Sequence, residues 1–155
     1  MYIKKAAAAL AALLFLFQFV ALAQDSSIVT WQATGKKIAD KTYELHMTAA
    51  IGANWHLYAQ DAGKGPEPTT FVFTPNPLVK YDGKIKEIGK QEQSFDKNFN
   101  STLKYYASKV DFVQKIKVKS ATATVVKGVV HFMVCNDRQC LPPRDVPFTI
   151  NIAGK

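Results

Sequence analysis

Hydrophobic and polar residues alternate along most of the chain, in short segments separated by turn residues. Thr42–Ile51 is the clearest example, with apolar side chains at Tyr43, Leu45, Met47, Ala49 and Ile51. A period of two is typical of a strand with one face in the core and the other in water. No stretch shows a sustained helical period, so the pattern predicts an all-β protein.

The same reading places further strands and the loops between them. Strands are predicted at residues 27–31, 55–58, 70–73, 78–88, 103–106, 110–118, 122–134 and 146–152. Asp82-Gly83 indicates a hairpin turn inside one of these strands, and Gly128 indicates a bulge or bend in another. Residues 61–69, rich in glycine and proline, and the polar stretch 91–101 are expected to be loops.

Many short antiparallel strands with turn signals between them favour an immunoglobulin-like β-sandwich. The chain has 155 residues, 48% of them hydrophobic, which suits a single compact domain over residues 24–155. The widely spaced cysteine pair of antibody domains is absent from the sequence. We therefore expect packing to hold the core, with contributions from Trp31, Trp55 and the phenylalanines.

The first residues have the pattern of a secretory signal peptide. Lys4 and Lys5 precede an almost uninterrupted apolar run over residues 6–21, and Ala21-Leu22-Ala23 offers small residues for cleavage before Gln24. An uncleaved anchor is the alternative, but the run is short against the roughly 20 residues that a span needs. We expect residues 1–23 to be removed, leaving a periplasmic or secreted protein without stable membrane insertion.

The net charge is positive but not organised for nucleic acid. The formal charge is +8, and removing Lys4 and Lys5 leaves +6. The remaining lysines are scattered and mostly alternate with apolar residues, as on the wet face of a strand. A nucleic-acid partner is therefore not expected.

Cys135 and Cys140 are the only cysteines, with four polar residues between them and Leu-Pro-Pro behind. Export makes a disulfide chemically feasible. A bridge that closes so short a loop contributes only about 2 kcal/mol by chain entropy, which is little for a structural staple. A tight, accessible loop suits an exchangeable bond instead. Spacing alone leaves both readings open.

Two other cysteine chemistries are less compatible with the sequence. A zinc site would combine Cys135 and Cys140 with His131 and either His46 or His56, but a single pair at this spacing is a weak metal signal. A cysteine protease needs one activated thiol, which a second cysteine this near would tend to oxidise. We expect no metal and no cofactor.

Three segments together resemble a known family. They are Trp55-His56-Leu57-Tyr58, the loop at residues 65–69 (Gly-Pro-Glu-Pro-Thr) and residues 134–143 (Val-Cys-Asn-Asp-Arg-Gln-Cys-Leu-Pro-Pro). This combination resembles the N-terminal periplasmic domain of the thiol:disulfide interchange protein DsbD. It is also similar to the stand-alone exported relatives often labelled disulfide bond corrector proteins.

The resemblance implies an immunoglobulin-like sandwich with a protein-disulfide reductase role. Cys135 and Cys140 would alternate between dithiol and disulfide. Electrons would come from a thioredoxin-like domain of a membrane thiol transporter and pass to exported disulfide-containing proteins. By position, Cys140 matches the cysteine that forms the mixed disulfide with a partner, and Cys135 matches the one that resolves it.

The family also has a loop whose aromatic residue caps the disulfide. Phe99, or else Phe95, lies where that loop is expected, and Tyr58 matches an aromatic residue beside the cysteines. His56 and Tyr58 alternate with Trp55 and Leu57, so one of these two pairs is expected to face outward. The rival interpretation is a non-catalytic exported binding module in which the disulfide only shapes a loop.

Overall fold

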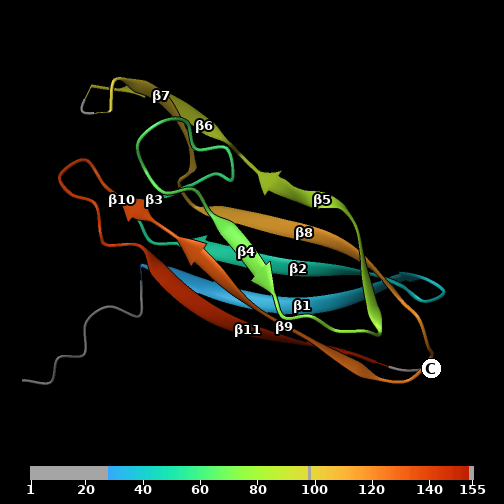
Figure 1. Cartoon of the computed structure of the whole chain (residues 1–155). Coiled ribbons are helices and arrows are strands. Elements are labelled where there is room, and N and C mark those ends of the chain that lie inside the picture. The colour runs from blue at the N-terminus through green and yellow to red at the C-terminus, as the bar shows by residue number, and fades with distance from the viewer. Residues whose placement is uncertain (1–27, 98, 154–155) are drawn as a thin grey trace, which may run out of the picture.

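The structure is a computed structural model that describes residues 28–97 and 99–153. This part of the chain folds into antiparallel β-strands (Figure 1). The strands are β1 (Val29–Ala39), β2 (Thr42–Ile51), β3 (His56–Tyr58), β4 (Thr70–Phe73), β5 (Val79–Gly89), β6 (Glu92–Asp96), β7 (Ser101–Tyr106), β8 (Lys109–Val118), β9 (Thr124–Phe132), β10 (Val134–Cys135) and β11 (Arg144–Ile152). The expected all-β, immunoglobulin-like sandwich is confirmed. The predicted signal peptide, residues 1–23, lies outside the described residues.

Two sheets form the sandwich and a third covers one end of it. The strand orders are β1-β2-β8-β5 and β11-β9-β4 for the two layers, and β10-β3-β7-β6 for the third sheet. In Figure 1 the third sheet lies at the end of the sandwich away from the C-terminus. Over the described ranges, no helix has the length and apolar character to cross a membrane.

The core forms where the alternating faces of the two layers meet. The predicted apolar face of β2 is buried as expected, with Leu45 and Ala49 fully inaccessible. Trp31 on β1 joins the layers, because its ring lies 5.9 Å from Phe112 on β8 and 5.4 Å from Phe132 on β9. Burial of such large rings is a main source of fold stability, and the expectation for Trp31 is confirmed.

The hairpin predicted at Asp82-Gly83 is wrong. β5 continues through both residues as one strand, with a shift of register against β8 between Asp82 and Lys86. The buried Gln114 amide stabilises this bulge by donating to the Asp82 and Gly83 carbonyl oxygens, at 3.2 and 3.4 Å. Gly83 has a φ of 74°, which glycine adopts without strain. The same residue type that permits a turn here permits a bulge.

Two other local predictions also differ from the structure. Residues 92–96, within the predicted loop at 91–101, form the polar edge strand β6, which pairs with β7. Gly128 is not a bulge, because it pairs regularly with Phe148 and Phe73 on its two sides. A Cβ at Gly128 would lie 2.5 Å from the Phe148 ring, so glycine leaves the space that the ring occupies.

Replacing Phe112 with alanine tests the aromatic contact between the layers. Phe112 is fully buried, so Phe112→Ala should lower the free energy of unfolding by about 3–5 kcal/mol in urea denaturation. Phe95→Ala is the matched control, because Phe95 is 61% exposed. Its replacement should lower the free energy of unfolding only slightly. Equal losses in the two variants would contradict this description of the core.

Candidate functional site: the cysteine hairpin and its pocket

The cysteine hairpin is an excursion of the chain between two paired strands. The strand predicted over residues 122–134 is split after Phe132, where the chain leaves one sheet and enters another. Cys135 then pairs with His56 of β3, in register. The chain rejoins its first sheet at Arg144, which pairs with Phe132. Both ends of the hairpin are therefore anchored in the sandwich.

Local hydrogen bonds fix the turn between the cysteines. The Asn136 amide donates to the Gln139 carbonyl oxygen at 2.9 Å. The Asn136 side-chain oxygen accepts from the backbone amides of Arg138 and Gln139, both at 2.9 Å. Asparagine commonly caps its own turn in this way. The ladder ends with Leu141 donating to Val134 at 3.0 Å, because the two prolines that follow have no amide hydrogen.

Cys135 and Cys140 form a disulfide whose two halves differ in environment. Their Cα atoms lie 4.0 Å apart as partners in an isolated antiparallel bridge. Cys135 is 2% exposed and packs with Tyr58, Ala62 and Leu103, whereas Cys140 is exposed. An incoming thiol therefore reaches the sulfur of Cys140 more easily than that of Cys135.

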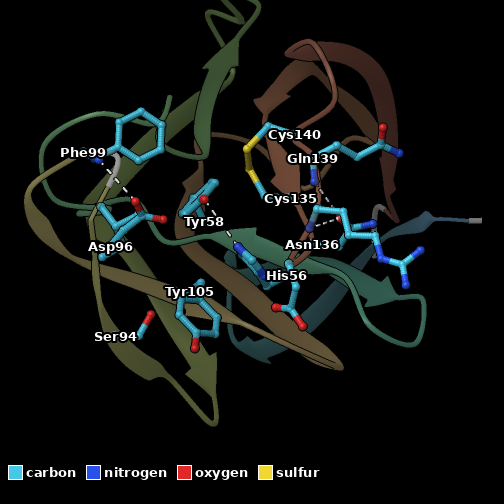
Figure 2. Close-up of a pocket in the computed structure, with 13 residues that line it drawn as sticks. His56, Tyr58, Ser94, Asp96, Phe99, Tyr105, Cys135, Asn136, Gln139 and Cys140 are labelled. Atoms are coloured by element: carbon cyan, nitrogen blue, oxygen red, sulfur yellow. Dashed lines mark hydrogen bonds between the residues drawn. A yellow bond between two sulfur atoms is a disulfide. The ribbon is translucent and has the colours of Figure 1, made fainter.

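The disulfide borders an open pocket of about 420 Å³ (Figure 2). The pocket is lined by His56, Tyr58, Ser94, Asp96, Phe99, Leu103, Tyr105, Cys135, Asn136, Asp137, Arg138, Gln139 and Cys140. These residues come from the third sheet, from the connection between β6 and β7 that carries Phe99, and from the cysteine turn. Polar and charged side chains predominate on the lining, so the pocket suits an exchange reaction in contact with water better than an apolar ligand.

His56 lies inside this pocket among aromatic side chains. Its Nε2 is 3.3 Å from the Tyr58 hydroxyl, and its ring centroid is 4.6 Å from that of Tyr105. Burial lowers the pKa of His56 below its ordinary 6.5, although the negative charges of nearby Asp137 and Asp96 act in the opposite direction. At neutral pH the imidazole is therefore predominantly uncharged.

Tyr58 lies beside the cysteines and is also buried. The residue is 1% exposed, and burial raises the pKa of its phenol to about 12, so it keeps its proton. Leu57, on the opposite face of the same strand, is fully inaccessible. The expectation that one pair of the aromatic strand faces outward is therefore wrong, because the sandwich core covers one face and the pocket cluster covers the other.

Phe99, and not Phe95, lines the pocket. Phe99 lies between β6 and β7, is partly buried, and packs against the cluster that contains Cys135. Its ring lies against Gly65, where an added Cβ would be 2.2 Å from the Phe99 Cδ1 atom. Phe95 is 61% exposed and is not part of the pocket lining.

The histidines considered for zinc have other partners or positions. His131 contacts Asp145 and Glu67, at 2.7 and 2.6 Å, and His46 contacts Asp111 at 2.7 Å. Only His56 shares the pocket with the cysteines. Among residues 28–97 and 99–153, no group of three or more histidine, cysteine, aspartate or glutamate side chains is arranged to hold a metal.

Several pocket residues were not singled out from the sequence. The polar pattern around Ser94 and Asp96 predicts a loop, and the strand pattern around Tyr105 does not indicate which strand it pairs with. The alternation that puts Leu103 and Tyr105 on one face of β7 was readable from the sequence. The pairing of Tyr105 with Tyr58, which brings that face to the cysteines, depends on tertiary structure.

Fold and site together define a β-sandwich domain that presents a hairpin disulfide in an open, polar and aromatic pocket. The family model described as "Thiol:disulfide interchange protein DsbD, N-terminal" matches residues 24–151, and the chain belongs to this family. Its members are periplasmic domains of thiol:disulfide interchange proteins. No curated protein sequence matches the chain.

Solved structures agree at the level of the fold. The N-terminal domain of DsbD from Neisseria meningitidis in its reduced form is 18% identical, with a TM-score of 0.55, and the alignment covers 86% of this chain and 90% of that one. The N-terminal periplasmic domain of ScsB from Proteus mirabilis is 15% identical, with a TM-score of 0.51. That alignment covers 80% of this chain and 44% of the ScsB chain.

The contacts of His131 generate a prediction for stability against pH. Glu67 and Asp145 raise the pKa of His131 above 6.5 through hydrogen bonds. The folded state therefore binds this proton more tightly than the unfolded state does. The resulting stabilisation is fully present below pH 6.5 and is lost as the pH rises through the folded-state pKa.

Thermal unfolding of His131→Gln over a pH series measures this effect. The loss of Tm relative to the wild type should be larger at about pH 5 than at about pH 9. Lys127→Gln, an exposed substitution on the same strand, controls for the loss of a positive charge. A deficit in His131→Gln that is the same at both pH values would contradict the assignment.

Proposed function

We propose that this chain is an exported thiol–disulfide exchange domain that carries electrons through Cys135 and Cys140. The donor is the thioredoxin-like domain of a membrane thiol transporter, and the acceptors are exported disulfide-containing proteins. Membership of the DsbD N-terminal family supports this proposal. The observation that carries it is the unequal exposure of the two cysteines of one disulfide, with Cys140 exposed and Cys135 buried.

In the reduced protein, the Cys140 thiolate attacks one sulfur of a partner's disulfide. That S–S bond breaks, a mixed disulfide forms, and the partner's other sulfur leaves as a thiolate that takes up a proton. The Cys135 thiolate then attacks the Cys140 sulfur, which closes the disulfide and releases the partner as a dithiol. The domain has then lost two electrons and the partner has gained two. A donor dithiol restores the reduced state by the reverse sequence.

Docking of another protein domain has support from a related complex. One similar structure is the complex between the DsbD N-terminal and PilB N-terminal domains of Neisseria meningitidis. It is 15% identical to this chain, with a TM-score of 0.50, and the alignment covers 83% of this chain and 87% of that one. We propose that this chain likewise docks a partner domain, of the thioredoxin-like class, and that it is exported through cleavage of the signal peptide before Gln24.

Phe99 is proposed as the cap that limits access to the disulfide. It packs on the cluster around Cys135 and lines the pocket, and it lies between β6 and β7, outside the two sandwich layers. A docked partner would displace the ring, which otherwise covers the Cys135 side of the disulfide.

Trapping tests the assigned roles of the two cysteines. Cys135→Ala should hold a partner on Cys140 as a mixed disulfide, visible as a reducible band on a non-reducing gel, because the resolving thiol is missing. Cys140→Ala is the matched control and should trap little, because its remaining thiol is buried. Equal trapping by the two variants would contradict the assignment.

A redox titration separates a shuttle from a structural bridge. The Cys135–Cys140 couple should equilibrate with glutathione in the folded protein, at a potential above the limit of about −300 mV that is typical of structural disulfides. Replacing both cysteines with serine should abolish exchange. A lower potential, or full function in the serine variant, would favour the non-catalytic binding module instead.

Phe99→Ala tests the cap. Dithiothreitol should reduce the disulfide of this variant several-fold faster than that of the wild type, because an alanine leaves the cluster around Cys135 less covered. Phe95→Ala is the control and should react at the wild-type rate, because Phe95 is exposed and outside the pocket. Unchanged kinetics in Phe99→Ala would remove Phe99 from this role.

A further inference from the structure

The buried position of Cys135 raises a question about its proton. To resolve a mixed disulfide, this thiol must first become a thiolate, because only the thiolate attacks. Cys135 is 2% exposed and packs mainly against apolar and aromatic groups, an environment that disfavours the charged form. The carboxylates of Asp96 and Asp137 also line the pocket and oppose a negative sulfur. A neighbouring group must therefore take the proton.

Resting on the function proposed above, we infer that His56 is the proton acceptor for Cys135 in the resolving step. His56 and Cys135 are direct partners in the antiparallel pairing of β3 with β10. Side chains of directly opposed residues lie on the same face, with Cβ atoms about 4.5–5.5 Å apart. Both residues line the pocket, and Figure 2 shows the imidazole below the Cys135 side chain.

The groups around His56 suit a base that is charged only transiently. Tyr58 lies on its own strand, Tyr105 on β7, Glu92 and Asp96 on β6, and Asp137 and Arg138 on the cysteine turn. Burial keeps the pKa of the imidazole below 6.5, so a lone pair is available at neutral pH. The three carboxylates stabilise the imidazolium once it forms, since each of them acts to raise that pKa.

Tyr58 orients the ring. The Tyr58 hydroxyl lies 3.3 Å from Nε2 of His56. Among the described residues, this is the hydrogen bond that the imidazole makes. With the ring held by this contact, the imidazole nitrogen that carries the lone pair receives the Cys135 proton. The Cys135 thiolate then attacks Cys140, the partner sulfur leaves, and the new disulfide closes. The imidazolium afterwards returns its proton to water or to the departing thiolate.

An aromatic disulfide, dithiobis(nitrobenzoate), resolves the two steps in one stopped-flow trace. The reduced protein releases one thionitrobenzoate when Cys140 attacks the reagent. It releases a second when Cys135 displaces the first adduct from Cys140. In His56→Gln and His56→Phe the second phase should slow at least about 100-fold at neutral pH, the lower end for loss of a general base. The first phase should change far less.

The pH profile gives a readout that a structural role would not change. In the wild type, the second phase should gain rate as His56 loses its proton, below about pH 6.5. In both His56 variants, the rate of the second phase should rise only at the higher pH where the Cys135 thiol itself ionises. The Gln variant keeps a polar group beside Tyr58, and the Phe variant keeps a ring against Tyr105. His46→Gln, on β2 and outside the pocket, is the control and should match the wild type.

The outcomes separate the two proposals. If the folded wild type releases two equivalents but both His56 variants keep its second-phase rate and pH profile, then His56 is not the base, and the exchange function stands. If the folded, reduced wild type releases none, then the cysteines are not an exchange pair, and both proposals fall. Slowing confined to the second phase, with the predicted pH shift, supports the role of His56.

Discussion

The site depends on the short pairing between β3 and β10. Only two residue pairs make it, Val134 with Leu57 and Cys135 with His56. They hold the cysteine hairpin on the third sheet after the chain has left β9. Because this register alternates faces, Leu57 points into the main core while His56 lies beside the cysteine. A shift of one residue would exchange these positions and separate the imidazole from the sulfur.

This arrangement also explains why the two sulfurs are unequal. The strand half of the hairpin lies on the third sheet and is covered by Tyr58 and Leu103, so Cys135 is buried. The returning half has no such cover and ends in two prolines, so Cys140 is exposed. Thiol–disulfide exchange needs one accessible cysteine that reacts with partners and a second, protected cysteine that resolves the mixed disulfide. The sheet provides both positions.

Much of the fold was predictable because alternation is a strong signal wherever one face is buried. The β2 face, the sandwich class and the cysteine turn all followed from the order of residues. The failures occurred where that signal is weak. β6 is a polar edge strand, and the Asp82-Gly83 dipeptide serves a bulge as well as a turn. The contact of Tyr105 with the site depends on the pairing of β7 with the distant strand β3, which no local pattern encodes. Asp96 reaches the site because β6 is paired with that same strand β7.

The anchoring of the hairpin at both ends has a consequence for the working cycle. Phe132 and Arg144 pair across its base, and eight further residue pairs extend β9 and β11 beyond them. The sulfur–sulfur bond therefore closes a loop that the sheet already holds shut. Reduction of this bond releases only the few residues of the turn and leaves the paired strands in place. The same fold can therefore hold both the disulfide and the dithiol form without refolding between turnovers.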